Sequence, residues 1–280
     1  MSLPLDGPVS LNGPVLVAGA GKMGGALLEG LISRGLPAAQ IIVQDPAPPA
    51  DVSEFLVRHG IRVEREVTAL VAAPSILLVA VKPQLMDAVF PRLAKFAGPE
   101  TVVVSIAAGR TLASFERSLG AGIAVIRAMP NTPAQVGRGV TACVANHATT
   151  EVQRALASDL MAAVGEVVWL DREDDMDAVT AVSGSGPAYV FLVAECLAEA
   201  GRAAGLSADL AAQLARATVA GAGELLHCSP LDAATLRQNV TSPGGTTAAA
   251  LAVLMAEPGM QDLFSQAVAA AVRRSRELSK

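Results

Sequence analysis

The stretch Pro14-Val15-Leu16-Val17-Ala18-Gly19-Ala20-Gly21-Lys22-Met23-Gly24 decides the fold of the first part of the chain. Its apolar start has the pattern of a buried strand, and its glycines have the spacing G-x-G-x-x-G. Residues 26–33 continue at helical spacing. Strand, glycine turn and helix form the context of a dinucleotide-binding turn, in which two glycines admit a pyrophosphate and the third permits close packing. The glycine pattern alone is common, so its weight depends on the rest of the chain.

The next apolar run, Ile41 to Gln44, is followed by Asp45, and counting from Gly24 to Asp45 gives 21 residues. This is close to the spacing of about 20 at which an acid binds the ribose 2′-hydroxyl of NAD. In a second interpretation, Asp45 only begins a proline-rich turn. A carboxylate would repel a ribose 2′-phosphate, and residues 46–57 contain no Lys or Arg to receive one. We therefore expect some preference for the cofactor without that phosphate.

Strand-like and helix-like runs alternate up to about residue 170. We expect further strands at 61–64, 76–81, 102–106, 124–129, 140–144 and 167–170, and helices at 53–59, 84–96, 112–119 and 152–164. The strands are continuous apolar runs, which is typical of a parallel sheet covered on both faces. The sequence therefore predicts an α/β fold that begins with a Rossmann-type, doubly wound sheet.

Three polar or glycine-bearing turns follow strands of this sheet, at residues 81–84, 105–109 and 127–133. Lys82, in the first turn, is a candidate for a phosphate or a substrate carboxylate. Asn131, in the third, is a candidate for the nicotinamide amide or the substrate. Each residue could also be a loop residue without a ligand. Because the carboxyl ends of parallel strands share one edge, we expect all three turns to face one crevice.

Strand patterns end after Asp174, and the remainder reads as all-α. We expect helices at about 176–204, 208–227, 231–239, 246–256 and 261–278. The domain boundary therefore falls near Arg172, with a dinucleotide-binding domain at 1–172 and a helical domain at 173–280. The helical part is rich in Ala and Gly and would form a marginal core by itself. We therefore expect it to pack against a second copy of the chain.

The stretch Thr241-Ser242-Pro243-Gly244-Gly245-Thr246-Thr247 lies at the start of one of these helices. We expect Ser242 to cap the helix, and the two glycines allow the backbone to approach a ligand. Free N–H groups at a helix N-terminus suit a carboxylate or a phosphate. The alternative is a capped turn between two helices.

Composition narrows the class of protein further. The 280 residues are 52% hydrophobic and 17% charged, with a net charge of −5, which favours neither nucleic acid nor an anionic membrane as a partner. The three cysteines and three histidines are scattered, so we expect no disulfide framework and no metal site. The first residues lack the pattern of a signal peptide, and no uncharged apolar run reaches the length of a membrane span. We expect a cytoplasmic protein.

Taken together, these segments resemble the pyrroline-5-carboxylate reductase family, which catalyses the last step of proline synthesis. The matching segments are GAGKMG at 19–24, AVKPQ at 80–84, SIAAG at 105–109, RAMPNTPA at 127–134, VSGSGPAYVF at 182–191 and VTSPGGTT at 240–247. They follow the family's order from about residue 14 to the C-terminus, and the last two are much more specific than the glycine turn. The resemblance implies reduction of the C=N bond of 1-pyrroline-5-carboxylate to L-proline by NADP(H) or NAD(H). It also implies a homodimer of interlocked helical domains, often assembled further into rings.

The resemblance also implies where the sites lie. Its substrate loop corresponds to Ser242, Gly244, Gly245, Thr246 and Thr247, with Thr247 as the catalytic residue near the substrate nitrogen. Its cofactor site corresponds to Gly19, Ala20, Gly21, Lys22, Met23, Gly24, Ala80, Val81, Lys82 and Pro83. To these the residue patterns add Asp45 at the ribose, and Lys82 and Asn131 at the substrate. Once the ring nitrogen is protonated, the imine carbon accepts hydride without a separate strong acid, so catalysis would be mostly placement.

Two other functions remain open at this level. Another Rossmann-plus-helical reductase, acting on small hydroxy acids, would ordinarily need a Lys or His for acid–base chemistry, and Lys82 is the candidate. A non-enzymatic dinucleotide-sensing protein would keep the glycine turn but would not need the loop at 242–247.

Overall fold

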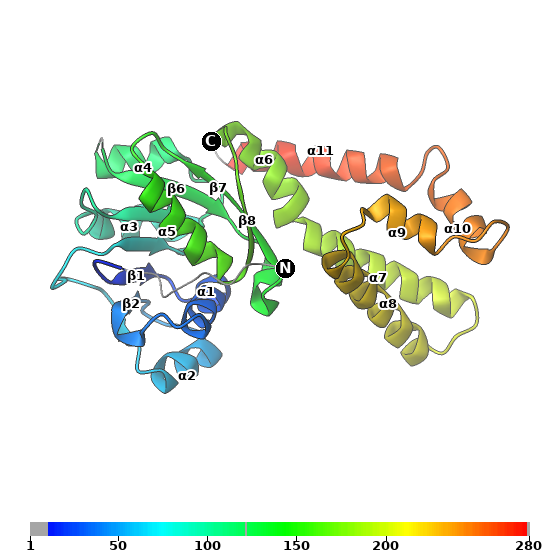
Figure 1. Ribbon diagram of the computed structural model, residues 1–280, viewed down its shortest axis with the longest axis horizontal. Coiled ribbons are helices and arrows are strands. Elements are labelled where there is room, and N and C mark those ends of the chain that lie inside the picture. The colour runs from blue at the N-terminus through cyan, green and yellow to red at the C-terminus, as the bar shows by residue number, and fades with distance from the viewer. Residues whose placement is uncertain (1–10, 121, 279–280) are drawn as a thin grey trace. The chain divides into compact units, whose positions relative to one another are not determined.

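The computed structural model describes residues 11–120 and 122–278. Residues 1–10, on which the expectation about a signal peptide rests, lie outside the described residues. The described chain forms two compact units, one of residues 11–184 with 272–278 and the other of residues 185–271. The first contains the β-sheet, and the described part of the second contains only helices and loops (Figure 1).

The sheet unit is built on one eight-stranded sheet with the order β3-β2-β1-β4-β5-β6-β7-β8. Its strands are β1 (Val15–Ala18), β2 (Ile41–Gln44), β3 (Arg62–Glu64), β4 (Ile76–Val79), β5 (Val102–Ser105), β6 (Ala124–Met129), β7 (Gly139–Ala145) and β8 (Gly165–Trp169). Strands β1 to β6 are parallel to one another, so their carboxyl ends share one edge. The order reverses direction between β1 and β4, the position at which such sheets bind ligands.

The last two strands run against the first six. Strand β7 pairs with β6 in antiparallel fashion, and β8 is parallel to β7. Only the short 3-10 turn η3 (Thr132–Val136) lies between β6 and β7, whereas a parallel neighbour requires a crossover of a dozen residues or more. Between β7 and β8 the helix α5 (Glu151–Ala162) provides that crossover.

Helices cover both faces of the sheet (Figure 1). The helices α1 (Lys22–Ser33), α2 (Ala50–Arg58) and α5 contribute to one hydrophobic core, and α3 (Met86–Ala94) and α4 (Leu112–Leu119) contribute to the other. Along β1, Val15 and Val17 belong to the first core and Leu16 and Ala18 to the second. All four are fully buried, which explains the continuous apolar run in the sequence. The predicted doubly wound α/β fold is confirmed.

The helical unit contains α7 (Gly186–Ala203), α8 (Ala208–Cys228), α9 (Ala233–Asn239), α10 (Thr246–Leu254) and most of α11 (Met260–Leu278). The single helix expected at 176–204 is divided into α6 (Met176–Val179), the π-helical turn η5 (Thr180–Gly184) and α7. Pro187 stands in the first turn of α7 and has no N–H group with which to continue a regular helix ladder.

The compact units divide after Gly184 rather than near Arg172. The physical reason is burial, because Met176 in α6 is 1% exposed and packs in the core that contains α3 and α4. The end of α11 returns to the same unit, where the Ser275 hydroxyl donates to Asp177 Oδ1 at 2.5 Å. Residues 173–184 therefore pack with the sheet unit, although they follow Arg172.

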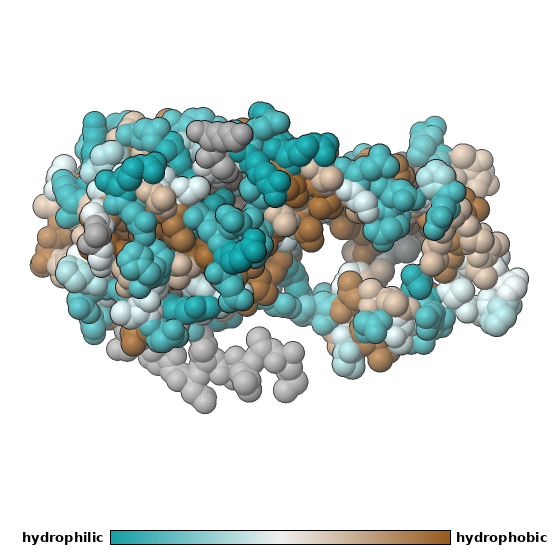
Figure 2. Space-filling model, turned by 90° about the horizontal axis from the view of Figure 1, so that it is seen from above, coloured by the Kyte–Doolittle hydropathy of each residue, from teal (hydrophilic) through white to brown (hydrophobic). Residues whose placement is uncertain are grey.

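Large apolar side chains remain on the surface of the helical unit (Figure 2). Examples on α7 and α8 are Val190, Phe191, Leu192, Leu197, Leu210, Leu214, Leu225 and Leu226, all between 43% and 61% exposed. Within the helical stretch Glu173–Ala203 an 18-residue window has a mean hydropathy of 1.3, so the stretch is long and apolar enough to cross a membrane by length and composition alone. A surface of this kind marks an interaction site.

Replacement of Phe115 by alanine should destabilise the sheet unit by about 3–5 kcal/mol. The side chain is 1% exposed, and its ring packs edge-on against Phe90 with the ring centroids 4.9 Å apart. Urea unfolding followed by circular dichroism measures the effect. Val57→Ala, at an 81% exposed position of α2, is the control and should change stability by less than about 0.5 kcal/mol. Equal effects of the two variants would contradict this account of the core.

Candidate functional site

A pocket of about 420 Å³ lies at the carboxyl ends of the parallel strands. It is lined by Gly19, Gly21, Gln44, Asp45, Pro46, Ala47, Pro49, Arg65, Glu66, Ala80, Val81, Lys82, Leu85, Ala88, Val89 and Arg92. These residues follow β1, β2, β3 and β4, so the pocket spans the position where the strand order reverses. This is the expected place for a nucleotide in a doubly wound sheet.

The glycine turn between β1 and α1 forms one wall of the pocket. Gly19 has φ +94°, and a Cβ there would lie 2.6 Å from the carbonyl oxygen of Ala80. A Cβ at Gly24 would overlap the carbonyl oxygen of Gly19. Gly21 differs, because no atom lies within 4 Å of the position of its Cβ. Two glycines therefore permit the turn itself, and Gly21 leaves open space beside the first N–H groups of α1, which are suited to an anion.

Asp45 connects this turn to the loop after β2. Its Oδ2 accepts a hydrogen bond from the Ala20 N–H at 2.7 Å, and its Oδ1 accepts one from the Ala47 N–H at 2.9 Å. The second bond agrees with the interpretation of Asp45 as the start of a turn. The first bond was not foreseen. The carboxylate therefore holds two walls of the pocket together.

The other predicted cofactor residues have different surroundings. Ala80, Val81 and Lys82 line the pocket, and Pro83 begins the 3-10 turn η2 (Pro83–Leu85) beside it. The residues of the glycine segment that do not line it are Ala20, Lys22, Met23 and Gly24. Of these, Ala20 and Gly24 are buried, Met23 packs against the core and Lys22 is exposed.

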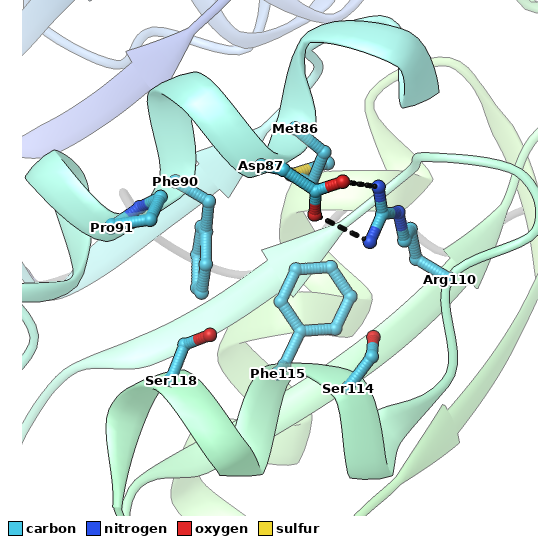
Figure 3. Close-up of a pocket in the computed structure, with 8 residues that line it drawn as sticks. All are labelled: Met86, Asp87, Phe90, Pro91, Arg110, Ser114, Phe115 and Ser118. Carbon is cyan, nitrogen blue, oxygen red and sulfur yellow. Dashed lines mark hydrogen bonds and ion pairs between the residues drawn. The ribbon is translucent and has the colours of Figure 1, made fainter.

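A second pocket, of about 90 Å³, lies between α3 and α4 (Figure 3). There the Arg110 guanidinium pairs with Asp87 at 2.8 and 2.9 Å and donates to the Pro83 carbonyl oxygen at 3.3 Å. The hydrogen bond from Arg110 lowers the pKa of the Asp87 carboxyl. Arg110 thus braces the turn that contains Lys82, a role that the sequence patterns did not indicate.

Asn131 is placed in the sheet unit but does not line the large pocket. Both polar atoms of its side-chain amide make hydrogen bonds to the backbone. Nδ2 donates to the Ser183 carbonyl oxygen at 3.2 Å, and Oδ1 accepts from the Val140 N–H at 2.9 Å. The residue is 9% exposed. Its amide therefore connects the loop after β6 to the turn η5, and one N–H of Nδ2 has no hydrogen-bond partner among the described residues.

The loop at 242–247 belongs to the helical unit and thus to a different compact unit from the pocket. The prediction that Ser242 caps α10 is wrong. Gly245 is the N-cap residue, no side chain caps the helix, and the Ser242 carbonyl oxygen accepts from the Gly245 N–H at 3.1 Å because the loop folds back as a turn. Gly244 has φ +69°, a conformation that favours glycine. The N–H groups of Thr246 and Thr247 in the first turn have no partner within the helix.

The sequence patterns did not indicate three charged residues of the pocket, two after β3 and one on α3. Arg65 and Glu66 line the pocket, and Arg92 on α3 donates to Glu66 Oε1 at 3.0 Å. The available signal was the strand order, because β3 pairs with β2 and its end lies beside Asp45. The described residues contain no group of three or more His, Cys, Asp or Glu that could hold a metal ion.

Comparisons with known proteins agree with this geometry. A family model described as "NADP oxidoreductase coenzyme F420-dependent" matches residues 15–109, which contain the glycine turn and all the residues that line the large pocket. A second, described as "Pyrroline-5-carboxylate reductase dimerisation", matches residues 173–278.

Individual relatives match almost the whole chain. The pyrroline-5-carboxylate reductases of Pseudomonas aeruginosa and Synechocystis sp. are both 42% identical to it, covering 94% of this chain and 95% and 97% of theirs. The structure of a pyrroline-5-carboxylate reductase from Coxiella burnetii has a TM-score of 0.89 at 35% identity, covering 96% of this chain and 99% of that one. The Plasmodium falciparum pyrroline carboxylate reductase with NADP bound has a TM-score of 0.79 at 27% identity, with the same coverage. The resemblance seen in the motifs is confirmed, and the chain belongs to the pyrroline-5-carboxylate reductase family.

Proposed function

We propose that this chain reduces the C=N bond of 1-pyrroline-5-carboxylate to give L-proline, with NADPH or NADH as the hydride donor. The observation that carries the proposal is that a chain of this family has both a pocket at the nucleotide position of its sheet and the loop at 242–247. The pocket suits a pyrophosphate at Gly21, and the loop presents free N–H groups to an anion. The substrate has one carboxylate and one ring nitrogen, and the chain has a separate group for each.

In this proposal the N–H groups of Thr246 and Thr247 bind the substrate carboxylate, with Ser242 and the two glycines shaping the loop. The Thr247 hydroxyl contacts the ring nitrogen. A bound reduced nicotinamide would supply hydride to the imine carbon, and the electron pair of the C=N bond would move to the protonated nitrogen, which would become the amine of proline. The protein's contribution is placement of the two carbons against each other.

The pocket residues position the cofactor. The glycine turn receives the pyrophosphate, while the turn at 80–83, which Arg110 braces, borders the site on the other side. Lys82 supplies a positive charge for a phosphate or for the substrate carboxylate. Asn131 has one N–H of Nδ2 that could donate to the nicotinamide amide or the substrate, because the hydrogen bond to Ser183 uses only one of the two.

The test is oxidation of NADPH or NADH with 1-pyrroline-5-carboxylate as substrate, and with small 2-keto acids as the comparison. Turnover of the cyclic imine alone supports the proposal. Turnover of the keto acids alone would indicate a reductase of small acids with Lys82 as the acid. Cofactor binding without turnover of either would indicate a dinucleotide sensor.

We further propose that the chain has two functional domains, at 1–172 and 173–280. Two copies of the chain then form a homodimer through their helical domains. The exposed apolar residues of α7 and α8 and the dimerisation family's match support this. Assembly into rings is part of the same proposal. Location in the cytoplasm, a reducing compartment, also belongs to this proposal, and it agrees with the finding that Cys143, Cys196 and Cys228 form no disulfide in the described chain.

Thr247→Ala should lower kcat/KM for the imine roughly ten- to a hundred-fold, because it removes one hydrogen bond at the reacting nitrogen worth about 1–3 kcal/mol. Thr247→Ser keeps a hydroxyl and is the matched control, which should retain most of the activity. Steady-state kinetics measure both variants. If Thr247→Ala retains full efficiency, the hydroxyl has no catalytic role.

Gly244→Val should raise KM for the imine and leave cofactor affinity unchanged. A Cβ at φ +69° strains the loop by about 1–2 kcal/mol, whereas Gly245 has an ordinary extended conformation. Gly245→Ala is therefore the control and should have the smaller effect. Substrate kinetics and cofactor titration measure the two quantities. A loss of cofactor affinity in Gly244→Val would contradict the separation of the two sites.

Leu214→Asp should convert the homodimer into monomers and abolish activity. The side chain is 48% exposed on α8, and a charge there would be desolvated in an interface. Val57→Asp, at an exposed position of the sheet unit, is the control and should stay dimeric. Sedimentation at micromolar concentration distinguishes the states. A dimeric Leu214→Asp variant would place the interface elsewhere.

A further inference from the structure

Charged side chains surround the part of the pocket that follows β2 and β3. Asp45 and Glu66 are negative, and Arg65, Lys82 and Arg92 are positive. Both negative groups are already bonded within the protein. The Asp45 carboxylate accepts two backbone N–H groups at 2.7 and 2.9 Å, and Glu66 accepts from Arg92 at 3.0 Å.

Arg65 has a different position. The Asp45 N–H donates to the carbonyl oxygen of Glu64 at 3.0 Å, so Arg65 follows directly after the residue that pairs with Asp45. It is exposed and lines the pocket, and in the described part of the chain no hydrogen bond or ion pair occupies its guanidinium. A planar guanidinium with five donors is suited to a phosphate, which it can bind through two parallel hydrogen bonds.

In a doubly wound sheet the adenosine ribose lies at the end of the strand after the glycine helix, which is β2 here. A phosphate on the ribose 2′-oxygen would therefore lie beside Asp45 and within the region that Arg65 borders. The backbone N–H groups bonded to Asp45 offset part of its negative charge. The expected preference for the cofactor without the 2′-phosphate rested on Asp45 and on residues 46–57. It took no account of Arg65 or of the N–H groups bonded to Asp45.

We propose that Arg65 binds the ribose 2′-phosphate of NADPH, and that Asp45 is a positioning residue that ties the glycine turn to the loop after β2. Arg65 thus gives the chain a preference for the phosphorylated cofactor. This inference rests on the proposed function, because a cofactor preference matters only if the chain uses the cofactor as a hydride donor. It concerns the cofactor alone and predicts a binding difference that exists without substrate.

Isothermal titration of the full chain with 2′-phospho-ADP-ribose and with ADP-ribose tests the proposal, because the two probes differ only in the 2′-phosphate. The wild type should bind the phosphorylated probe at least about tenfold more tightly, and Arg65→Ala should weaken that probe about 10- to 100-fold. Its affinity for ADP-ribose should change less than about threefold. Arg58→Ala removes an exposed arginine of α2 that pairs with Glu54, and this control should keep the wild-type preference.

Asp45→Ala tests the positioning role of Asp45. It should weaken the binding of both probes, because the glycine turn loses the hydrogen bond between Ala20 and Asp45. Tighter binding of the phosphorylated probe by Asp45→Ala would overturn the proposal, since Asp45 would then act by repulsion. Equal affinity of the wild type for both probes, or equal losses for both in Arg65→Ala, would also overturn it. These outcomes are independent of imine reduction, so a failure here and a failure of the proposed function are distinguishable.

Discussion

The close approach of backbone segments at the end of β1 is the constraint on which the sheet unit's site depends. Gly19 lies against the carbonyl of Ala80, and Gly24 lies against the carbonyl of Gly19, so neither position has room for a Cβ. This packing directs the first turn of α1 towards the pocket and brings the ends of β1 and β4 together. Gly21, between Gly19 and Gly24, has open space instead, because the turn packs closely against backbone only at those two glycines.

Polar ties then stabilise the loops around that turn. Asp45 bonds to Ala20 on one side and Ala47 on the other, and Arg110 bonds to the carbonyl of Pro83. The bond from Ala20 to Asp45 and the bond from Arg110 to Pro83 join loops that follow different strands, whereas the bond from Ala47 shapes the loop after β2 itself. Side chains whose sequence position suggests a ligand can therefore serve to hold loops in place instead, as Asn131 also does through its bonds to Val140 and Ser183.

The helical unit is organised by a different constraint, namely too little buried apolar surface. On α8 only Ala211 and Ala215 are buried, while leucines such as Leu210 and Leu214 remain exposed. Small residues allow close helix packing but bury little area. The unit therefore requires a further surface against its apolar side, and the match of this region to a dimerisation family identifies the kind of surface.

The sequence by itself determined the strands, most of the helices, the fold class and the family, because these depend on local patterns such as the apolar run of β1 and the glycine spacing. It also located the loop at 242–247, although not the cap of α10. Only the tertiary structure decided the antiparallel direction of β7, the tie made by Asp45 and the presence of Arg65 and Arg92 in the pocket. The physical reason is that these features arise from pairing between segments far apart in the chain, for which no local periodicity exists.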